Sequence, residues 1–265
     1  MRKITVSEMK EIQLSILDDI HNFCVENNIR YSLSGGTLLG AIRHKGYIPW
    51  DDDIDLMMPR PDYNRFCKLY SSEKNELVDL SKIDSCVEMF VKVYRKGTVM
   101  YDSFFHRELF GVNIDIFPID GTPKEETITY VNNILKKRAF LPKICPFYKT
   151  SKSKRLLNFF KYLLKKLYYF SYYDIAYLKN QINDEIQKYN FEQSEYAGAI
   201  LGSNGIKELI HRKNFDKYIS LPFEGREYLA IAGYDIYLTS LYSDYMTLPP
   251  LEQRISHHLY DVYIK

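Results

Sequence analysis

The sequence predicts an α/β fold in which helices cover a small mixed β-sheet, and three patterns lead to that prediction. Apolar residues recur at helical spacing over residues 6–28. Two short apolar runs, 53–58 and 111–117, each hold an aspartate among residues that favour buried strands. A longer stretch, 124–190, has helical character in several pieces. Helices and short strands that alternate in this way are typical of a sheet with helices packed on its faces.

The first helix is predicted by a capping box, Thr5-Val6-Ser7-Glu8, in which the threonine and the glutamate each accept a backbone N–H of the other. Its apolar face consists of Met9, Ile12, Ile16, Ile20 and Phe23. The elements expected after it, in chain order, are strand 30–34, short helix 37–44, strand 53–58, helix 62–71, strand 87–94, strand 111–117, the helical pieces of 124–190 and a closing helix at 235–247.

The strand at 53–58 carries Asp53 and Asp55 two positions apart, so both side chains point to the same face. Asp55 is flanked by Ile54 and Leu56, and an unpaired carboxylate in such apolar surroundings is costly. We therefore interpret the two aspartates as ligands of a divalent cation, with a structural ion pair as the alternative. The preceding Asp51-Asp52 pair, at the strand entrance, is expected to cap the chain or to be solvated.

A third carboxylate, Asp115, lies among isoleucine and phenylalanine residues in the predicted strand 111–117. The same reasoning places it in the metal site, whereas Asp120, which precedes a glycine, is expected to be a turn residue. Two acids on one strand and one on a neighbouring strand are able to hold one or two Mg²⁺ ions, or Mn²⁺ in their place. Such a site orients a phosphate and stabilises in-line displacement, so these three aspartates are the candidate catalytic residues.

A Gly-Gly turn joins the first predicted strand to the short helix. Its residues are Ser34, Gly35, Gly36 and Thr37. Backbone N–H groups at the start of a helix bind phosphate well, so this turn is a candidate phosphate cradle. The alternative is an ordinary strand-to-helix turn, and the nearby acids favour the phosphate interpretation.

Three single residues near the acids are candidates for substrate binding. Arg43 suits bidentate binding of a phosphate, although a solvated basic loop is the alternative. Trp50 is placed to stack on a base or sugar, or to hold a choline-like cation, with core packing as an equal alternative. Lys92 is a candidate contact for a diphosphate, while an exposed strand lysine is the commoner outcome.

The Gly-Gly turn, the Asp-x-Asp strand and the later strand aspartate together resemble the nucleotidyltransferase fold. A narrower resemblance rests on the stretches 36–44 (GTLLGAIRH) and 46–55 (GYIPWDDDID) and on a tail at 241–258. These resemble the LicD family of phosphocholine transferases, from about residue 10 to the C-terminus and most weakly between about 122 and 220. The sequence departs from the family pattern at Ser243, where glycine is usual, and at 228–234, which lacks an expected proline.

The resemblance implies a Mg²⁺-dependent transfer of phosphocholine or a similar phospho-alcohol group. The donor would be CDP-linked, the acceptor a hydroxyl of a glycan precursor for lipopolysaccharide, teichoic acid or capsule, and CMP would leave. Asp115 is the first candidate to take the acceptor proton. One alternative is a nucleotidyltransferase that acts on a small hydroxyl or phosphate acceptor, and another is a non-catalytic glycan-binding module. Choline, glycerol and ribitol all remain open as head groups.

Three residues of the tail, Arg254, His257 and His258, gain interest only through this resemblance. A histidine pair is able to act as a ligand or a proton shuttle, so the three are candidate substrate-binding residues. A solvated surface pair is the alternative.

The formal net charge of +2 conceals a strongly basic segment. The 47 residues between Glu126 and Asp174 contain 11 basic residues and no acid, which leaves a net charge of −9 on the rest of the chain. Within this segment, 151–170 reads as a basic, aromatic amphipathic helix that is expected to lie on an anionic membrane. A packed helix with a basic outer side is the alternative, and without a recognition motif no nucleic-acid partner is expected.

The chain is expected to divide into a catalytic core at 1–123, a basic helical insert at 124–190 and a part at 191–265 that completes the catalytic domain. Its four cysteines show no C-x-x-C spacing and are expected to be reduced thiols. A signal peptide and a bilayer-spanning run are both missing from the sequence pattern. We therefore expect a cytoplasmic protein, peripheral to the inner face of the plasma membrane, that acts on a lipid-linked glycan acceptor.

Overall fold

The structure is a computed structural model, and it describes residues 1–83, 86–102, 107–108, 110–144, 160, 163–164, 174–202, 204–255 and 260–265. The α-helices are α1 Val6–Glu26, α2 Gly35–His44, α3 Arg60–Leu69, α4 Thr127–Arg138, α5 Leu141–Ile144, α7 Ile175–Ile186 and α8 Tyr234–Tyr242. The strands are β1 Arg2–Lys3, β2 Ser32–Leu33, β3 Asp55–Pro59, β4 Asn75–Asp79, β5 Val91–Arg95, β6 Thr98–Asp102, β7 Arg107–Glu108, β8 Asn113–Gly121, β9 Tyr196–Gly198, β10 Ile210–His211, β11 Tyr218–Phe223, β12 Arg226–Ile231 and β13 Tyr260–Ile264. Short 3₁₀ helices are η1 Leu80–Lys82, η2 Phe191–Gln193, η3 Gly205–Glu208, η4 Arg212–Phe215 and η5 Leu251–Gln253.

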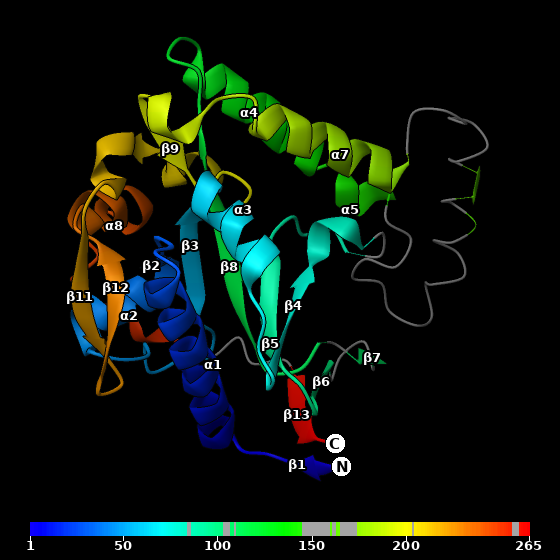
Figure 1. The fold of residues 1–265 in the computed structure, drawn as a ribbon, viewed down its shortest axis with the longest axis vertical. Helices are drawn as coiled ribbons and strands as arrows, with labels where there is room; N and C mark the ends of the chain where they lie inside the picture. Colours follow the sequence, from blue (N-terminus) through cyan, green and yellow to red (C-terminus); the bar gives the residue numbers. More distant parts are fainter. Residues whose placement is uncertain are drawn as a thin grey trace.

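A mixed sheet of seven strands forms the centre of the described part of the molecule (Figure 1). Its main order is β10-β9-β8-β3-β2. Strand β5 pairs with β4 and also with β8, on the edge of β8 opposite β3. The β3–β8 pair is parallel, whereas β5 and β2 run antiparallel to their partners. Together with the covering helices, this arrangement confirms the predicted α/β fold.

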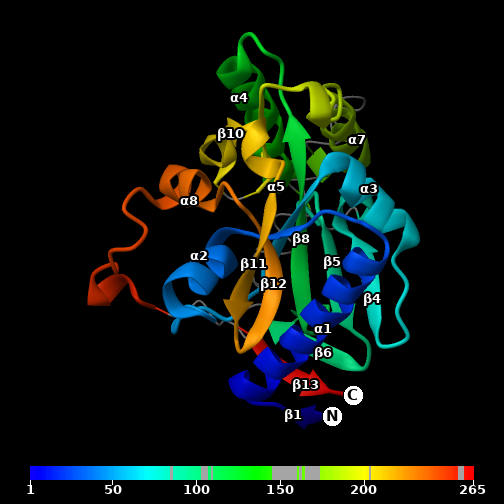
Figure 2. The same cartoon turned by 60° about the vertical axis from the view of Figure 1, so that its left-hand side comes forward.

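The long helix α1 packs across the sheet as the capping box and its apolar spacing predict (Figure 2). The Glu8 backbone N–H donates to Thr5 Oγ1 at 3.2 Å, and the Thr5 N–H donates to Glu8 Oε2 at 2.8 Å. Met9, Ile16 and Ile20 on the inner face are fully buried. Burial of this apolar stripe stabilises the helix more than its intrinsic propensity does.

Strand β8 is longer than the sequence predicts, and its end corrects one expectation. Asp120 is not a turn residue, because it lies inside β8 and is only 1% exposed. Arg60 donates to both of its carboxylate oxygens, each at 2.6 Å. This bidentate ion pair is the compensation that a buried carboxylate requires, and it joins the start of α3 to the end of β8.

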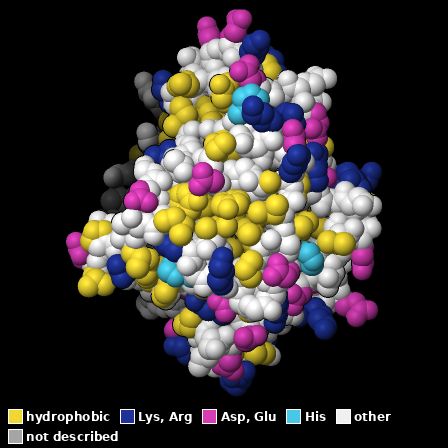
Figure 3. Space-filling model, turned by 90° about the vertical axis from the view of Figure 1, so that its left-hand side faces the viewer, with side chains coloured by type: hydrophobic (Ala, Val, Ile, Leu, Met, Phe, Trp, Pro, Cys, Tyr) yellow, Lys and Arg dark blue, Asp and Glu magenta, His cyan; other side chains and the backbone are white. Residues whose placement is uncertain are grey.

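Several strands were missed in the sequence, among them β4, which pairs with β5 of the predicted strand 87–94, and the hairpin of β11 with β12. The hairpin packs between α2 and the edge strand β2 (Figure 2). Its turn is Glu224-Gly225, both at positive φ (52° and 73°), as a two-residue hairpin turn requires. Pro222 within β11 weakened the strand pattern. Figure 3 views the molecule from this side, where apolar side chains gather in a band. In the hairpin, Ile219, Leu221 and Leu229 are half-buried against the core.

The closing helix α8 ends at Tyr242, five residues before the predicted end at 247. Ser243 follows with φ +61° and ψ −113°, a backbone conformation that favours glycine. This is the position where the resembling family usually has glycine. The departure from the family pattern therefore leaves the sharp turn in place, at a cost in backbone strain.

Helices α4, α5 and α7 form a layer above one end of the sheet (Figure 1). They share a second apolar cluster that includes Val131, Ile134, Leu141 and Ile182, so the helical character predicted for 124–190 is confirmed where the structure describes it. The predicted membrane helix at 151–170 lies outside the described residues, apart from 160 and 163–164. Among the helices that the structure describes, none combines the length and apolarity needed to cross a bilayer.

A small antiparallel sheet of β1, β13, β6 and β7 lies at the opposite end (Figure 1). Because β1 pairs with β13, the N- and C-terminal strands of the chain are neighbours. The first residue of β13, Tyr260, reaches the central sheet beside the aspartates described next.

Candidate active site

Asp55 and Asp115 lie side by side on the two central parallel strands. They are register partners on β3 and β8, and the Asp115 backbone N–H donates to the Ile54 carbonyl at 3.1 Å. The Asp55 backbone N–H donates to Thr37 Oγ1 at 2.9 Å, which ties the strand to the start of α2. Strand pairing thus brings together two carboxylates and a Gly-Gly turn that the sequence singles out separately.

Lys92 supplies positive charge to this group, directly beside Asp115. It is the register partner of Asp115 on β5, and its ammonium group contacts Asp115 Oδ1 and donates to Asn113 Oδ1 at 3.1 Å. The lysine and Asp115 side chains are about one-fifth exposed. Lys92 therefore points at the candidate site and is not the exposed strand lysine of the alternative interpretation.

The carboxyl groups of Asp53 and Asp55 have raised pKa values because they are desolvated and because other acids lie close to them. Desolvation by the surrounding protein, then the charge of Asp51 and a hydrogen bond to it, raises the pKa of Asp53 to about 8, although Asp53 is an exposed residue by its accessible surface. Burial and the charges of Asp53 and Asp115 raise the pKa of Asp55 well above its usual value, against the opposing effect of Lys92. A cation at this point would relieve the repulsion among these carboxylates.

The expectation for the Asp51-Asp52 pair holds only in part: Asp51 Oδ1 accepts the Asp52 backbone N–H at 3.2 Å, as a local cap, but neither residue is simply solvated. Asp51 interacts directly with Asp53 and lies against the Gly-Gly turn, because a Cβ added at Gly36 would be 2.8 Å from Asp51 Oδ2. Asp52 is buried, and its carbonyl accepts a hydrogen bond from Gln13 Nε2 at 3.0 Å. The odd-numbered aspartates 51, 53 and 55 thus approach one another, as their two-residue spacing could have indicated.

The Gly-Gly turn forms the beginning of α2, and its backbone is shaped for close approach. Gly35 has φ +49°, and a Cβ there would lie 3.6 Å from Asp55 Oδ2. Within the described residues, the Ser34 hydroxyl caps no N–H group of α2, since it lies 3.1 Å from the Tyr237 hydroxyl instead. The first N–H groups of the helix are therefore not capped by that side chain and lie beside the carboxylates, an arrangement that suits a metal-bridged phosphate.

Two cavities border the aspartates, with Asp51 in the wall of one and Asp53 and Asp115 in the wall of the other. A cavity of about 690 Å³ is lined by Gly36, Trp50, Asp51 and Tyr242. A smaller one, of about 330 Å³, is lined by Asp53, Lys92, Asp115 and Tyr260. The aspartates therefore stand between two recesses, as the reacting groups of an enzyme with two substrates would.

Arg43 and Arg254 lie near the larger cavity but are partly engaged within the protein. Arg43, which lines it, donates to the Tyr245 carbonyl at 2.7 Å. The guanidinium group of Arg254 lies 5.5 Å from the centre of the Trp50 ring and donates to the Pro249 carbonyl at 2.8 Å. One face of Trp50 thus already holds a cation. His257 and His258 lie outside the described residues.

Comparison with known proteins identifies the family. The sequence model of the LicD/FKTN/FKRP nucleotidyltransferase domain matches residues 28–149. The lipopolysaccharide cholinephosphotransferase LicD of Haemophilus influenzae is 35% identical over 275 residues, a match that covers all of both chains. The chain belongs to the LicD family. It is accordingly a phosphotransferase.

Three further relatives share parts of this LicD-family chain. An uncharacterized protein of Rickettsia typhi is 28% identical over 183 residues, 53% of this chain and 59% of its own. Human and mouse proteins named ribitol 5-phosphate transferase FKRP are 45% identical over 51 residues, 19% of this chain and 10% of theirs. The family resemblance drawn from the Gly-Gly turn and the aspartate run is therefore confirmed.

The carboxylates fit a hard divalent cation by their chemistry, although they are not already gathered around one. Among the described residues, no group of three or more His, Cys, Asp or Glu side chains is arranged to hold a metal ion. Oxygen donors are nevertheless the ligands that Mg²⁺ prefers, and the raised pKa of Asp53 and Asp55 marks a deficit of positive charge. Asp53, Asp55 and Asp115 would hold the ion, with Asp51 adjacent.

Sequence reasoning missed two tyrosines of the site. Tyr242, at the end of α8, lines the larger cavity, and Tyr260, on β13, lines the smaller one. Both reach the aspartates only through the packing of distant segments. With 24 tyrosines in the chain, no local signal distinguishes these two from the others.

Proposed function

We propose that this LicD-family protein transfers phosphocholine, or a similar phospho-alcohol group, from a CDP-linked donor to a hydroxyl of a lipopolysaccharide precursor. The position of the aspartates between two separate cavities carries the proposal, because group transfer needs a donor and an acceptor on opposite sides of the reacting phosphorus. The H. influenzae relative, whose name states cholinephosphotransferase activity on lipopolysaccharide, supports the choice of group and acceptor.

The donor is assigned to the larger cavity. The N–H groups at the start of α2 would receive its diphosphate, and the cavity beside Trp50 and Tyr242 would receive the alcohol. Asp51 and the ring faces in this cavity suit a quaternary ammonium group, which is bound by aromatic faces and a nearby negative charge. Arg254 on one face of Trp50 would have to move aside or leave the other face to the head group.

The acceptor is assigned to the smaller cavity. Its hydroxyl oxygen would attack the phosphorus that carries the alcohol, the bond from that phosphorus to the bridging oxygen would break, and CMP would leave. Asp115 lines this cavity and would take the hydroxyl proton, while Lys92, its ion-pair partner, would offset negative charge. When bound, Mg²⁺ would neutralise the charge of the donor diphosphate.

A second candidate reaction is attack on the nucleoside phosphorus. The match to a nucleotidyltransferase domain supports this second reaction. The product separates the two, because phospho-alcohol transfer releases CMP whereas nucleotidyl transfer leaves the nucleotide on the acceptor and releases pyrophosphate or a phospho-alcohol.

The test uses the full chain with CDP-choline and a lipopolysaccharide acceptor, in Mg²⁺, in Mn²⁺ and in EDTA. Release of CMP together with choline on the acceptor, lost in EDTA, is the expected result. CDP-glycerol and CDP-ribitol, run in parallel, identify the head group. A nucleotide found on the acceptor, or full activity in EDTA, would contradict the proposal.

The proposal extends to contact with an anionic membrane, where a lipid-linked acceptor would be found. It rests on the composition of 151–170, in which lysine and arginine alternate with leucine and phenylalanine.

A further inference from the structure

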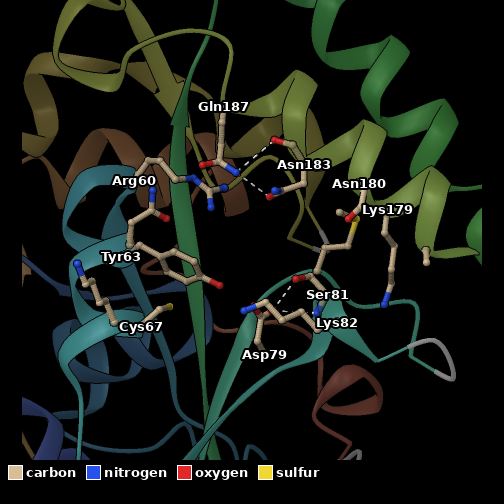
Figure 4. A pocket seen from close by; sticks show the side chains of 14 residues that line it. Arg60, Tyr63, Cys67, Asp79, Ser81, Lys82, Lys179, Asn180, Asn183 and Gln187 are labelled. Atoms are coloured by element: carbon tan, nitrogen blue, oxygen red, sulfur yellow. Dashed lines mark hydrogen bonds and ion pairs between the residues drawn. The ribbon is translucent and has the colours of Figure 1, made fainter.

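A cleft of about 620 Å³ lies apart from the aspartates, between α3, η1 and α7 (Figure 4). Its lining shares no residue with either cavity of the candidate active site. Arg60 stands at its upper edge, directly after β3, whereas Asp55 begins that strand. Arg60 lies five positions after Asp55, or about 16 Å along the chain at the usual strand rise. The cleft is therefore a third recess, with Arg60 at the opposite end of that strand and η1 between the cleft and the smaller cavity, which Leu80 lines.

Basic side chains dominate its charge. Arg60, Lys68, Lys82 and Lys179 line the cleft, and Asp79 is the one acid among the described lining residues. Asp79 is already engaged, since it accepts hydrogen bonds from the Ser81 N–H and hydroxyl and pairs with Lys82 at 3.2 Å. The acid therefore offers little repulsion to an incoming anion.

Two of the cations keep capacity for a ligand. Arg60 binds Asp120 through Nε and Nη2, so within the described residues Nη1 stays available on the cleft side. Lys68 is exposed on the same face of α3, two turns further along, and makes no ion pair with a described residue. Lys179 is buried and donates to the carbonyls of Leu80 and Ile83, so it fixes the wall that η1 forms.

Side-chain amides supply much of the uncharged polar lining. Asn64 of α3 lines the cleft. Asn180 and Asn183 of α7, and Gln187 directly after its end, line it from the other wall (Figure 4). Amides both donate and accept hydrogen bonds, which matches the hydroxyl groups of a sugar. The volume is in the range of small-molecule sites, and the polar walls disfavour a lipid chain or an apolar peptide.

We propose that this cleft binds an anionic sugar, one that carries a phosphate or a carboxylate, within the acceptor glycan. The inference rests on the proposed function, because it assumes a glycan acceptor. The basic side chains would receive the anion and the amides of α7 the hydroxyl groups. The distance to the aspartates means that this sugar lies a few residues along the glycan from the hydroxyl that is modified. Such a subsite selects acceptors by charge at a point remote from the chemistry.

The binding test measures the affinity of the full chain for glucose 6-phosphate by calorimetry in EDTA. Inorganic phosphate and glucose serve as the charge-only and sugar-only probes. The double variant Lys68→Gln/Lys82→Gln is expected to bind glucose 6-phosphate at least tenfold more weakly. Asn180→Ala is expected to weaken glucose 6-phosphate binding without affecting inorganic phosphate. A matched pair of exposed lysines elsewhere, exchanged as Lys207→Gln/Lys213→Gln, is expected to leave both affinities unchanged.

Unchanged affinity in Lys68→Gln/Lys82→Gln, or glucose that binds as tightly as its phosphate, would overturn the proposal. In the transfer assay, the same variant is expected to raise KM for an acidic glycan acceptor at least fivefold at constant kcat. It is expected to spare a short neutral acceptor. If no acceptor releases CMP, the proposed function fails while the calorimetric result still decides the cleft.

Discussion

Tyr237 holds the hydroxyl of Ser34 away from the start of α2. Its own hydroxyl, fully buried, donates to Glu208 Oε2 at 2.7 Å and lies 3.1 Å from Ser34 Oγ. Serine at the start of a helix ordinarily accepts from the first N–H groups. Here the Ser34 hydroxyl is held by Tyr237 instead. The N–H groups that we assign to the donor phosphates therefore need not first lose a hydrogen bond to Ser34.

Tyr237→Phe is therefore expected to raise KM for the CDP-linked donor about fivefold with a smaller change in kcat. The freed Ser34 hydroxyl would cap α2 and compete with the donor for about one hydrogen bond, or about 1 kcal/mol. Steady-state kinetics against donor concentration measure the effect. Addition of Ser34→Ala to Tyr237→Phe should bring KM back down, and an unrelieved KM in the double variant would show that Tyr237 acts only through stability.

Asp53→Asn, Asp55→Asn and Asp115→Ala are each expected to lower turnover by about a hundredfold or more while the fold persists. Each removes a charge from the group assigned to the metal and the reacting phosphate. Asp51→Ala is expected to lose much of its activity as well, since Asp51 contacts Asp53. Turnover in Mg²⁺ and circular dichroism measure the two effects, and near-normal turnover in both Asp53→Asn and Asp55→Asn would contradict the metal assignment.

In the absence of metal, stability is expected to fall as pH rises from about 4 to about 8. The pKa of Asp53 is raised to about 8 in the folded protein, against about 3.9 for an aspartate in the unfolded chain. Between these values the folded state binds the additional proton, so each rise in pH favours unfolding. Thermal melts in EDTA should show this slope, and Asp53→Asn should flatten it.

Mg²⁺ is expected to reverse that slope, because the ion must displace the proton and binds more tightly as pH increases. Thermal melts at saturating Mg²⁺ across the same pH range test this. A melting temperature that is independent of pH in EDTA would contradict the raised pKa of Asp53.

Exchange of Lys161, Lys165 and Lys166 for glutamine is expected to release the protein from anionic vesicles. Each basic residue near such a surface contributes about 1 kcal/mol, and salt should weaken the attraction. Vesicle co-sedimentation at low and physiological salt measures this. Transfer to a short water-soluble acceptor should persist. If the unmodified protein fails to sediment with vesicles at either salt, the membrane interpretation of 151–170 is wrong.

The sequence predicts the centre of this fold well because its signals there are local. Strand periodicity and apolar flanks identify Asp55 and Asp115, and the capping box marks the start of α1 where the structure has it. Asp120 was misjudged because its partner, Arg60, is distant in the sequence, and an aspartate before a glycine is typical of a turn. The positions of Asp51, Tyr242 and Tyr260 likewise depend on how remote segments pack, which no local pattern records.

The two cavities on either side of the aspartates have a kinetic meaning. If each admits one substrate, neither compound has to depart before the other arrives, and both are present when the phospho-alcohol moves. Double-reciprocal plots at several fixed acceptor concentrations would then intersect, and the stereochemistry at phosphorus would invert in a single displacement. An enzyme with a single recess for both substrates would have to hold the phospho-alcohol group covalently between two half-reactions. With two recesses, no covalent intermediate is required.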